Sequence, residues 1–173
     1  MFSYNFKYYL LLPVLMNIPS RRFRLWVMRK YHVSVGKDTV VCRRVSFRNG
    51  KNIQIGENCV INSNTLLDGR GGVIRIGNHV DIAQDSIIWT LEHDIHTHES
   101  MGGDVTIEDY CWIGCRVMIK PDVHIGESSI CAAYAVITKD IEGNAIYAGI
   151  PARKISDRNR TRDYILSFNS KYR

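Results

Sequence analysis

The sequence contains few cysteines and no long hydrophobic run. These two features argue against a disulfide-stabilised protein and against a membrane-spanning one. Its five cysteines are an odd number, and Cys111 and Cys115 lack the second pair or the spaced histidine of a zinc site. We therefore expect free thiols in a reducing compartment rather than a disulfide framework. The apolar stretch over residues 8–16 is interrupted by Pro13 and is too short for a membrane-spanning helix, which needs ~20 apolar residues.

Acidic residues are nearly absent from the N-terminal segment. Residues 1–51 contain eleven Lys or Arg and one acid, Asp38, whereas the remainder contains twelve bases and sixteen acids. No nucleic-acid recognition motif accompanies this charge, so we expect an anionic membrane face or an anionic substrate as partner, and no nucleic acid. The basic residues follow the apolar run rather than precede it, which argues against a secretory signal. We therefore predict a cytoplasmic protein, either free or in peripheral contact with the inner face of the membrane.

An aliphatic residue returns every six positions in five blocks of three. A second set, four residues after these positions, is small or β-branched, as at Thr39, Thr65, Ser86 and Ala135. This period matches neither a helix nor a continuous strand, but it fits short strands separated by regular corners, with three hexads closing one coil. The key positions, which we expect to point inward, are Val35, Val41, Phe47, Ile55, Ile61, Leu67, Ile76, Ile82, Ile88, Ile107, Ile113, Ile119, Ile125, Cys131 and Ile137.

The spacing of the blocks predicts the domain organisation. They start at residues 35, 55, 76, 107 and 125, and the long interval places an inserted loop at 94–106. We expect a helical leader and cap over 1–34, a β-helix over 35–142 and a C-terminal extension over 143–173. Ser20 can cap a helix over 21–31 that covers the first coil or touches lipid, and the stretch from Ser156 onward predicts a helical tail.

This pattern resembles that of the hexapeptide-repeat acyltransferases, in the branch that includes galactoside, maltose and polysaccharide-precursor O-acetyltransferases and xenobiotic acetyltransferases. The repeat and the segments 89–94, 111–114, 136–140 and 148–155 carry the resemblance. It implies an all-β fold, a left-handed parallel β-helix of about five coils, although the general rule for parallel crossovers predicts right-handed connections. It also implies a homotrimer with its active sites between adjacent subunits and acetyl-CoA as the acyl donor.

The same resemblance suggests the catalytic residues. Transfer of an acyl group from a thioester to a hydroxyl needs a base, and an imidazole suits this role at neutral pH. His93, before the inserted loop, matches the family's catalytic histidine, and Asp94 is a candidate to orient its ring. Asn62 resembles the family asparagine that contacts the acyl group and acceptor, and its alternative role is an asparagine ladder at a coil corner.

The resemblance also assigns residues that contact coenzyme A. The cationic groups suit its phosphates, although surface Lys and Arg are usually solvated, and Trp112 has trimer packing as an alternative role. The predicted set is Trp112, Gly114, Ala133, Thr138, Lys139, Arg153 and Lys154.

The histidines at 93, 96 and 98 raise the alternative of a metal enzyme, the γ-type carbonic anhydrase. Because they cluster in one loop with mixed spacing, we expect no metal and predict instead that the loop closes over the acceptor.

We therefore predict a coenzyme-A-dependent O-acetyltransferase that acts on a sugar hydroxyl in bacterial-type surface polysaccharide or glycolipid precursor synthesis. The basic leader favours a sugar-lipid or nucleotide-sugar acceptor. The alternatives are an antibiotic (xenobiotic) acetyltransferase and, in another class, a non-catalytic β-helix scaffold.

Overall fold

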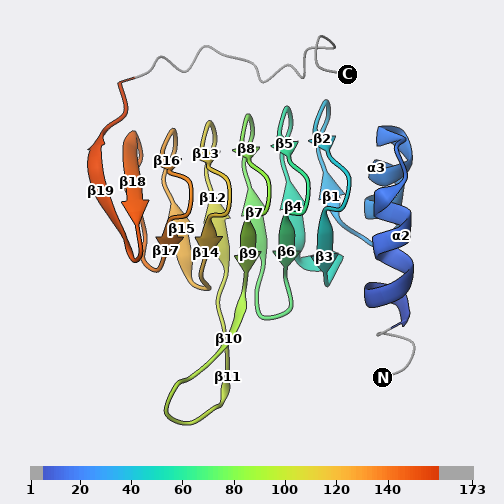
Figure 1. The fold of residues 1–173 in the computed structure, drawn as a ribbon, viewed down its shortest axis with the longest axis horizontal. Coiled ribbons are helices and arrows are strands. Elements are labelled where there is room, and N and C mark those ends of the chain that lie inside the picture. Colours follow the sequence, from blue (N-terminus) through green and yellow to red (C-terminus); the bar gives the residue numbers. More distant parts are fainter. Residues whose placement is uncertain (1–5, 160–173) are drawn as a thin grey trace.

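The computed structural model describes residues 6–159, in which three parallel sheets wind into a β-helix (Figure 1). Sheet A contains β1 (Ser34–Val35), β4 (Ile53–Ile55), β7 (Ile74–Ile76), β12 (Val105–Ile107) and β15 (Val123–Ile125). Sheet B contains β2 (Val40–Val41), β5 (Val60–Ile61), β8 (Asp81–Ile82), β13 (Trp112–Ile113), β16 (Ile130–Cys131), β18 (Ala145–Gly149) and the antiparallel β19 (Ala152–Asp157). Sheet C contains β3 (Ser46–Arg48), β6 (Leu66–Asp68), β9 (Ile87–Trp89), β14 (Met118–Ile119) and β17 (Val136–Ile137).

The hexad pattern correctly predicted the β-helix, and the family resemblance correctly implied its left-handed turn. In each block the first key residue lies in sheet A, the second in sheet B and the third in sheet C. Every key residue except Val35 belongs to the buried core, and so do residues of the second set such as Thr65 and Ser86. Both sets therefore point into the coil, because the chain alternates short strands with corners. All five cysteines are free thiols, and Cys59, Cys111 and Cys131 are buried among these inward residues.

The corners owe their shape to a recurring left-handed residue. Three positions after each key residue of sheets A and B, a non-glycine residue adopts φ between 53° and 63°. Asn and Asp tolerate this conformation best, and such residues turn the chain so that the next side chain points inward. The ten residues are Asp38, Arg44, Asn58, Asn64, His79, Asp85, Tyr110, Arg116, Ser128 and Tyr134.

The N-terminal elements cover the open end of the first coil (Figure 1). They are the π-helix η1 (Phe6–Leu11), α2 (Leu12–Asn17) and α3 (Arg21–Lys30), and a short 3₁₀ helix, η2 (Gly50–Asn52), occupies a corner of that coil. Leu12, Met16, Val27 and Met28 belong to the same apolar cluster as the coil interior. The cap therefore extends the core and shields the first coil from water.

Arginines of α3 pair with main-chain carbonyls of the first coil. Buried Arg24 donates a hydrogen bond from Nε to the Val41 carbonyl oxygen at 3.0 Å. This oxygen lies at the edge of a sheet, where a carbonyl without such a donor would have to bind water or another strand. Arg21 donates to the Thr39 oxygen at 3.2 Å, and Arg29 donates to the Val35 oxygen at 3.3 Å. Part of the N-terminal positive charge thus serves to cap the sheet edge.

Two boundaries differ from the sequence prediction. The insertion begins earlier than residue 94, because β10 (Leu91–His93) and β11 (Ser100–Gly102) form an antiparallel hairpin that leaves the wall (Figure 1). The β-helix also continues past residue 142, since β18 pairs in parallel with β16. Ser156 and Asp157 lie in β19 rather than in a helical tail, and the rest of that predicted helix, from residue 160, lies outside the described residues. Among residues 6–159, no helix has the length and apolar character needed to cross a bilayer.

Candidate active site

His93 stands on the extruded hairpin between sheets C and A, opposite Ser100. Its Nδ1 lies 3.1 Å from the carbonyl oxygen of His98. A carbonyl only accepts hydrogen bonds, so this contact favours the tautomer with the proton on Nδ1. The other ring nitrogen, Nε2, then carries the free lone pair on an exposed side chain. This geometry suits a general base.

Asp94 organises the hairpin loop rather than the imidazole directly. Its Oδ1 accepts hydrogen bonds from the amides of His96 and Thr97, both at 2.8 Å. The bonds from the Thr97 and His96 amides lower the pKa of this carboxyl group. The sequence prediction that Asp94 orients the ring therefore needs correction, because the group that contacts Nδ1 is the His98 carbonyl. Asp94 shapes the loop that presents this carbonyl.

An ion pair ties the base of the hairpin to the next coil. The Lys120 Nζ lies 2.8 Å from an Oε2 of Glu92, the residue before His93. Lys120 follows β14, which neighbours β9 in sheet C. This contact crosses 28 residues of sequence, and the hexad pattern gave no signal for it. It favours the observed position of the hairpin against the next coil.

Asn62 lies directly after β5, at the corner between sheets B and C. Its amide donates to Asp81 Oδ1 at 3.1 Å and to the Ile82 carbonyl at 3.0 Å. The Cys42 thiol lies 3.9 Å from its Oδ1. Burial raises the pKa of Asp81, and the hydrogen bond from Asn62 opposes that shift. The bond to Ile82 fits the corner-ladder alternative, whereas the bond to Asp81 gives the amide a fixed orientation.

Asp81 is a residue that the sequence reasoning missed. It pairs with Trp112 in the register of β8 and β13 and accepts a hydrogen bond from Asn62 at the neighbouring corner, so Asp81 links these two predicted residues. The available signal was an acid among the otherwise apolar outward residues of that sheet, such as Val60 and Ile130.

Four of the predicted coenzyme A residues line one groove of about 330 Å³ near the C-terminal end of the β-helix, namely Thr138, Lys139, Arg153 and Lys154. The Nζ of Lys154 lies 3.0 Å from Glu142 and 2.9 Å from Asp157, and hydrogen bonds to Asp157 and Glu142 raise the pKa of this lysine. Two carboxylates therefore balance its charge. Lys139 and Arg153 are exposed and form no ion pair within residues 6–159, so they are the available cations for a phosphate.

The other predicted coenzyme A residues lie on or beside sheet B. Trp112 lies on the outer face of sheet B, and its side chain is 47% exposed. Ala133 is also exposed and lies two residues after the end of β16. A Cβ at Gly114 would lie 2.7 Å from the Ala133 nitrogen, too close for a side chain without a backbone shift. Gly114 therefore has a packing function between successive coils, whatever its contact with coenzyme A.

The candidate residues fall on two edges of the prism, on either side of sheet C. The His93 hairpin, Thr138 and Lys139 lie between sheets C and A, whereas Asn62 and Gly114 lie between sheets B and C. A single chain thus does not join the predicted base to the predicted amide. Within residues 6–159, no three His, Cys, Asp or Glu side chains are arranged to hold a metal ion.

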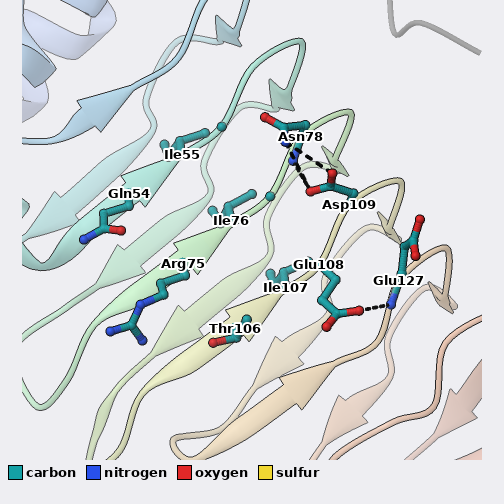
Figure 2. A pocket seen from close by; sticks show the side chains of 12 residues that line it. Gln54, Ile55, Arg75, Ile76, Asn78, Thr106, Ile107, Glu108, Asp109 and Glu127 are labelled. Atoms are coloured by element: carbon teal, nitrogen blue, oxygen red, sulfur yellow. Dashed lines mark hydrogen bonds between the residues drawn. The ribbon is translucent and has the colours of Figure 1, made fainter.

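A separate pocket of about 640 Å³ lies on the outer face of sheet A and its corner with sheet B (Figure 2). Its polar groups pair between neighbouring coils, as Asn78 does with Asp109 at 3.2 Å, and the Glu127 amide donates to Glu108 at 2.7 Å. None of the predicted site residues lines this pocket.

Comparison with known proteins gives consistent matches. The profile of the bacterial transferase hexapeptide (six repeats) family matches residues 104–139. A galactoside O-acetyltransferase of Escherichia coli K12 is 34% identical over 139 residues, which are 77% of this chain and 68% of the relative. A putative colanic acid biosynthesis acetyltransferase of the same strain is 27% identical over 143 residues, which are 81% of this chain and 78% of the relative.

A solved structure agrees with these sequence matches. The crystal structure of a hexapeptide-repeat-containing acetyltransferase of Vibrio cholerae, complexed with acetyl coenzyme A, superposes with a TM-score of 0.78. It is 29% identical, and the match covers 86% of this chain and 84% of that one.

Proposed function

This chain belongs to the hexapeptide-repeat acyltransferase family, and from that premise we propose that it transfers an acetyl group from acetyl-CoA to a sugar hydroxyl. The contact between His93 Nδ1 and the His98 carbonyl carries this proposal, because it leaves Nε2 free to accept a proton. Nε2 takes the proton of the acceptor hydroxyl while the hydroxyl oxygen bonds to the acetyl carbonyl carbon. The new ester bond forms and the thioester C–S bond breaks. The proton then passes from Nε2 to the departing thiolate, which restores the neutral imidazole.

The donor site is proposed at the C-terminal groove. Acetyl-CoA supplies an activated acyl group, and the similarity to a structure complexed with it supports this donor. The exposed cations Lys139 and Arg153 in the groove of about 330 Å³ fit a phosphorylated ligand. In the same proposal Asn62 and Trp112 contact the acyl end, and Asp94 supports the hairpin.

A homotrimer would complete the site. The outward residues of sheet C include the apolar Leu66, Ile87, Met118 and Val136, and those of sheet B are apolar except for Asp81. Those of sheet A are the polar Ser34, Gln54, Arg75, Thr106 and His124. Apolar faces on a prism favour contact with another copy. Packing across sheet C would bring the His93 edge of one subunit toward the Asn62 edge of the next, which is why we propose that activity requires assembly.

We propose a surface polysaccharide or glycolipid precursor as the acceptor class. The similarity to a colanic acid biosynthesis acetyltransferase supports this pathway, and the basic N-terminal segment supports an anionic acceptor or membrane face. We place the enzyme in the cytoplasm, free or at the inner face of the membrane. An antibiotic acetyltransferase remains the alternative function, and acetylation of a neutral antibiotic in preference to every sugar acceptor would favour it.

The test is His93→Ala. Turnover should fall by roughly 10²–10⁴, the usual contribution of a general base, while assembly and coenzyme A binding persist. His96→Ala is the matched control, and His98→Ala should also remain active because alanine keeps the main-chain carbonyl. Chelation should leave the rate unchanged. Near-normal transfer by a folded His93→Ala protein with its true acceptor would refute the proposal.

A further inference from the structure

A positively charged cleft lies along the surface where the cap meets the first coil. It measures about 730 Å³ and is lined by α3 on one side and by residues 36–42 on the other. Four arginines and a single carboxylate line it, namely Arg21, Arg22, Arg24, Arg29 and Asp38. The groove proposed for coenzyme A lies by β17 and β19, at the opposite end of the β-helix (Figure 1). The two cationic sites are therefore distinct.

The arginines of the cleft keep their charge uncompensated. Their hydrogen bonds run to neutral main-chain carbonyls, as for Arg21 and Arg29, and none of the four forms an ion pair with a carboxylate of residues 6–159. Burial lowers the pKa of Arg24, Cys42 opposes this shift, and the neighbouring Arg43 and Arg21 add to it. An anion in the cleft would relieve this repulsion.

The cleft also presents the start of a helix. Ser20 caps α3 and lines the cleft together with the first residues of that helix. The N-terminal turn of a ten-residue helix carries a partial positive charge and unpaired amides, which adds to the field of the arginines. Arg22, at this turn, is exposed and so available to a ligand. Guanidinium groups bind phosphate oxygens in pairs of charge-assisted hydrogen bonds.

The cleft ends beside the predicted acceptor site. Cys42 lines it, and the Cys42 thiol lies 3.9 Å from Oδ1 of Asn62. Asn62 in turn donates to Asp81. A molecule with a phosphate among the arginines could therefore place its next group at Asn62.

We propose that this cleft binds the phosphates of the acceptor, and that the acceptor is a sugar linked to a diphosphate, the chemistry shared by nucleotide-linked and lipid-linked sugars. This assignment rests on the proposed function, since it takes Asn62 to mark the acceptor hydroxyl. It accounts for the concentration of positive charge in the N-terminal segment, which the catalytic residues do not use.

Binding of inorganic pyrophosphate to the full chain tests the cleft without turnover. Calorimetry with saturating coenzyme A, which fills the other cationic groove, should detect one site per chain. Arg22→Gln should weaken it at least about tenfold, as loss of a charge-assisted hydrogen bond would, and Arg29→Gln provides a second variant. Lys51→Gln is the charge-matched control, because Lys51 is exposed on η2 and outside the cleft. If pyrophosphate did not bind, or if neither arginine variant weakened its binding, the assignment of the cleft as a phosphate site would be refuted.

Acetyl transfer then identifies the source of the diphosphate. A nucleotide-linked sugar and a polyprenyl-diphosphate-linked sugar are compared with the same free sugar, and at least one should have a kcat/KM about tenfold higher or more. Arg22→Gln should reduce that preference, and Lys51→Gln should not. Equal use of the free sugar would overturn the acceptor assignment. Pyrophosphate binding without transfer to any acceptor would instead refute the proposed function, and the acceptor assignment with it, while the anion site itself would stand.

Discussion

Replacing Arg24 by Met tests how the β-helix closes its first coil. The methionine keeps an apolar stem of similar length but removes the guanidinium, which donates to the Val41 oxygen at 3.0 Å and to the Ile18 oxygen at 2.6 Å. Arg24 is 5% exposed, so water does not readily replace it at these carbonyls. The substitution therefore leaves two main-chain acceptors without their present donor.

The expected loss follows from these two bonds. A hydrogen bond to a charged group contributes about 1.5–3 kcal/mol, so two contribute roughly 3–6 kcal/mol before any offset. Part of this free energy is recovered, because burial and two nearby arginines disfavour the Arg24 cation that the substitution removes. The same effects lower the pKa of Arg24. We expect the free energy of unfolding to fall by about 2–4 kcal/mol, which lowers Tm by roughly 4–16 °C for a chain of this size.

Urea and thermal unfolding of the assembled protein measure this change. Arg22→Met is the control, since Arg22 is exposed in the same helix, and its unfolding free energy should change by no more than ~0.5 kcal/mol. If Arg24→Met were as stable as Arg22→Met, the hydrogen bonds from α3 to the first coil would not be what stabilises the cap.

The hairpin and the cap give three further predictions. Lys120→Met breaks the 2.8 Å pair with Glu92 and should lower kcat more than it raises the KM for acetyl-CoA. The control Lys51→Met should alter neither constant. An unchanged kcat in Lys120→Met would show that the pair does not position His93. Asp94→Ala should lower turnover roughly 10- to 100-fold, less than loss of the base itself, because a small misplacement of a catalytic group costs up to about 10². The folded pKa of Asp94 is lowered, so its support of the loop is present above the ordinary value of about 3.9 and is lost as pH falls through the folded pKa. The protection of the His96 and Thr97 amides, measured relative to intrinsic exchange at each pH, should therefore fall only below about pH 4 in the wild type and be lost at every pH in Asp94→Ala. Replacing the exposed Leu10, Val14 and Trp26 by Ser should weaken binding of the protein to anionic vesicles. The fold should persist, because the buried Leu12 and Met16 anchor the cap on the core. Equal vesicle binding by the variant would show that these three residues do not contact the membrane.

The sequence alone determined the coil and nominated the residues of the candidate site. A six-residue period reports which side chains must leave water, and burial of Ile82, Ile113 and their counterparts follows directly from it. The groups at Thr138, Lys139, Arg153 and Lys154 were likewise predicted as one set, and one groove contains them. The hexad repeat was sufficient to predict the coil because neighbouring coils repeat the same local geometry.

Only the tertiary structure decided which groups act on those residues. The carbonyl of His98 that contacts His93, the Asp81 carboxylate beside Asn62 and the carbonyls paired with Arg24 carry no signal in a hexad pattern. A main-chain oxygen is present at every position, so its use depends on where a loop folds back. Contacts between coils join residues about twenty positions apart, and their partners are fixed by coil stacking and by the insertions at the corners. The strand at 145–149 was missed for a related reason, since sheet B gains it by pairing with β16 after the hexad repeat has ended.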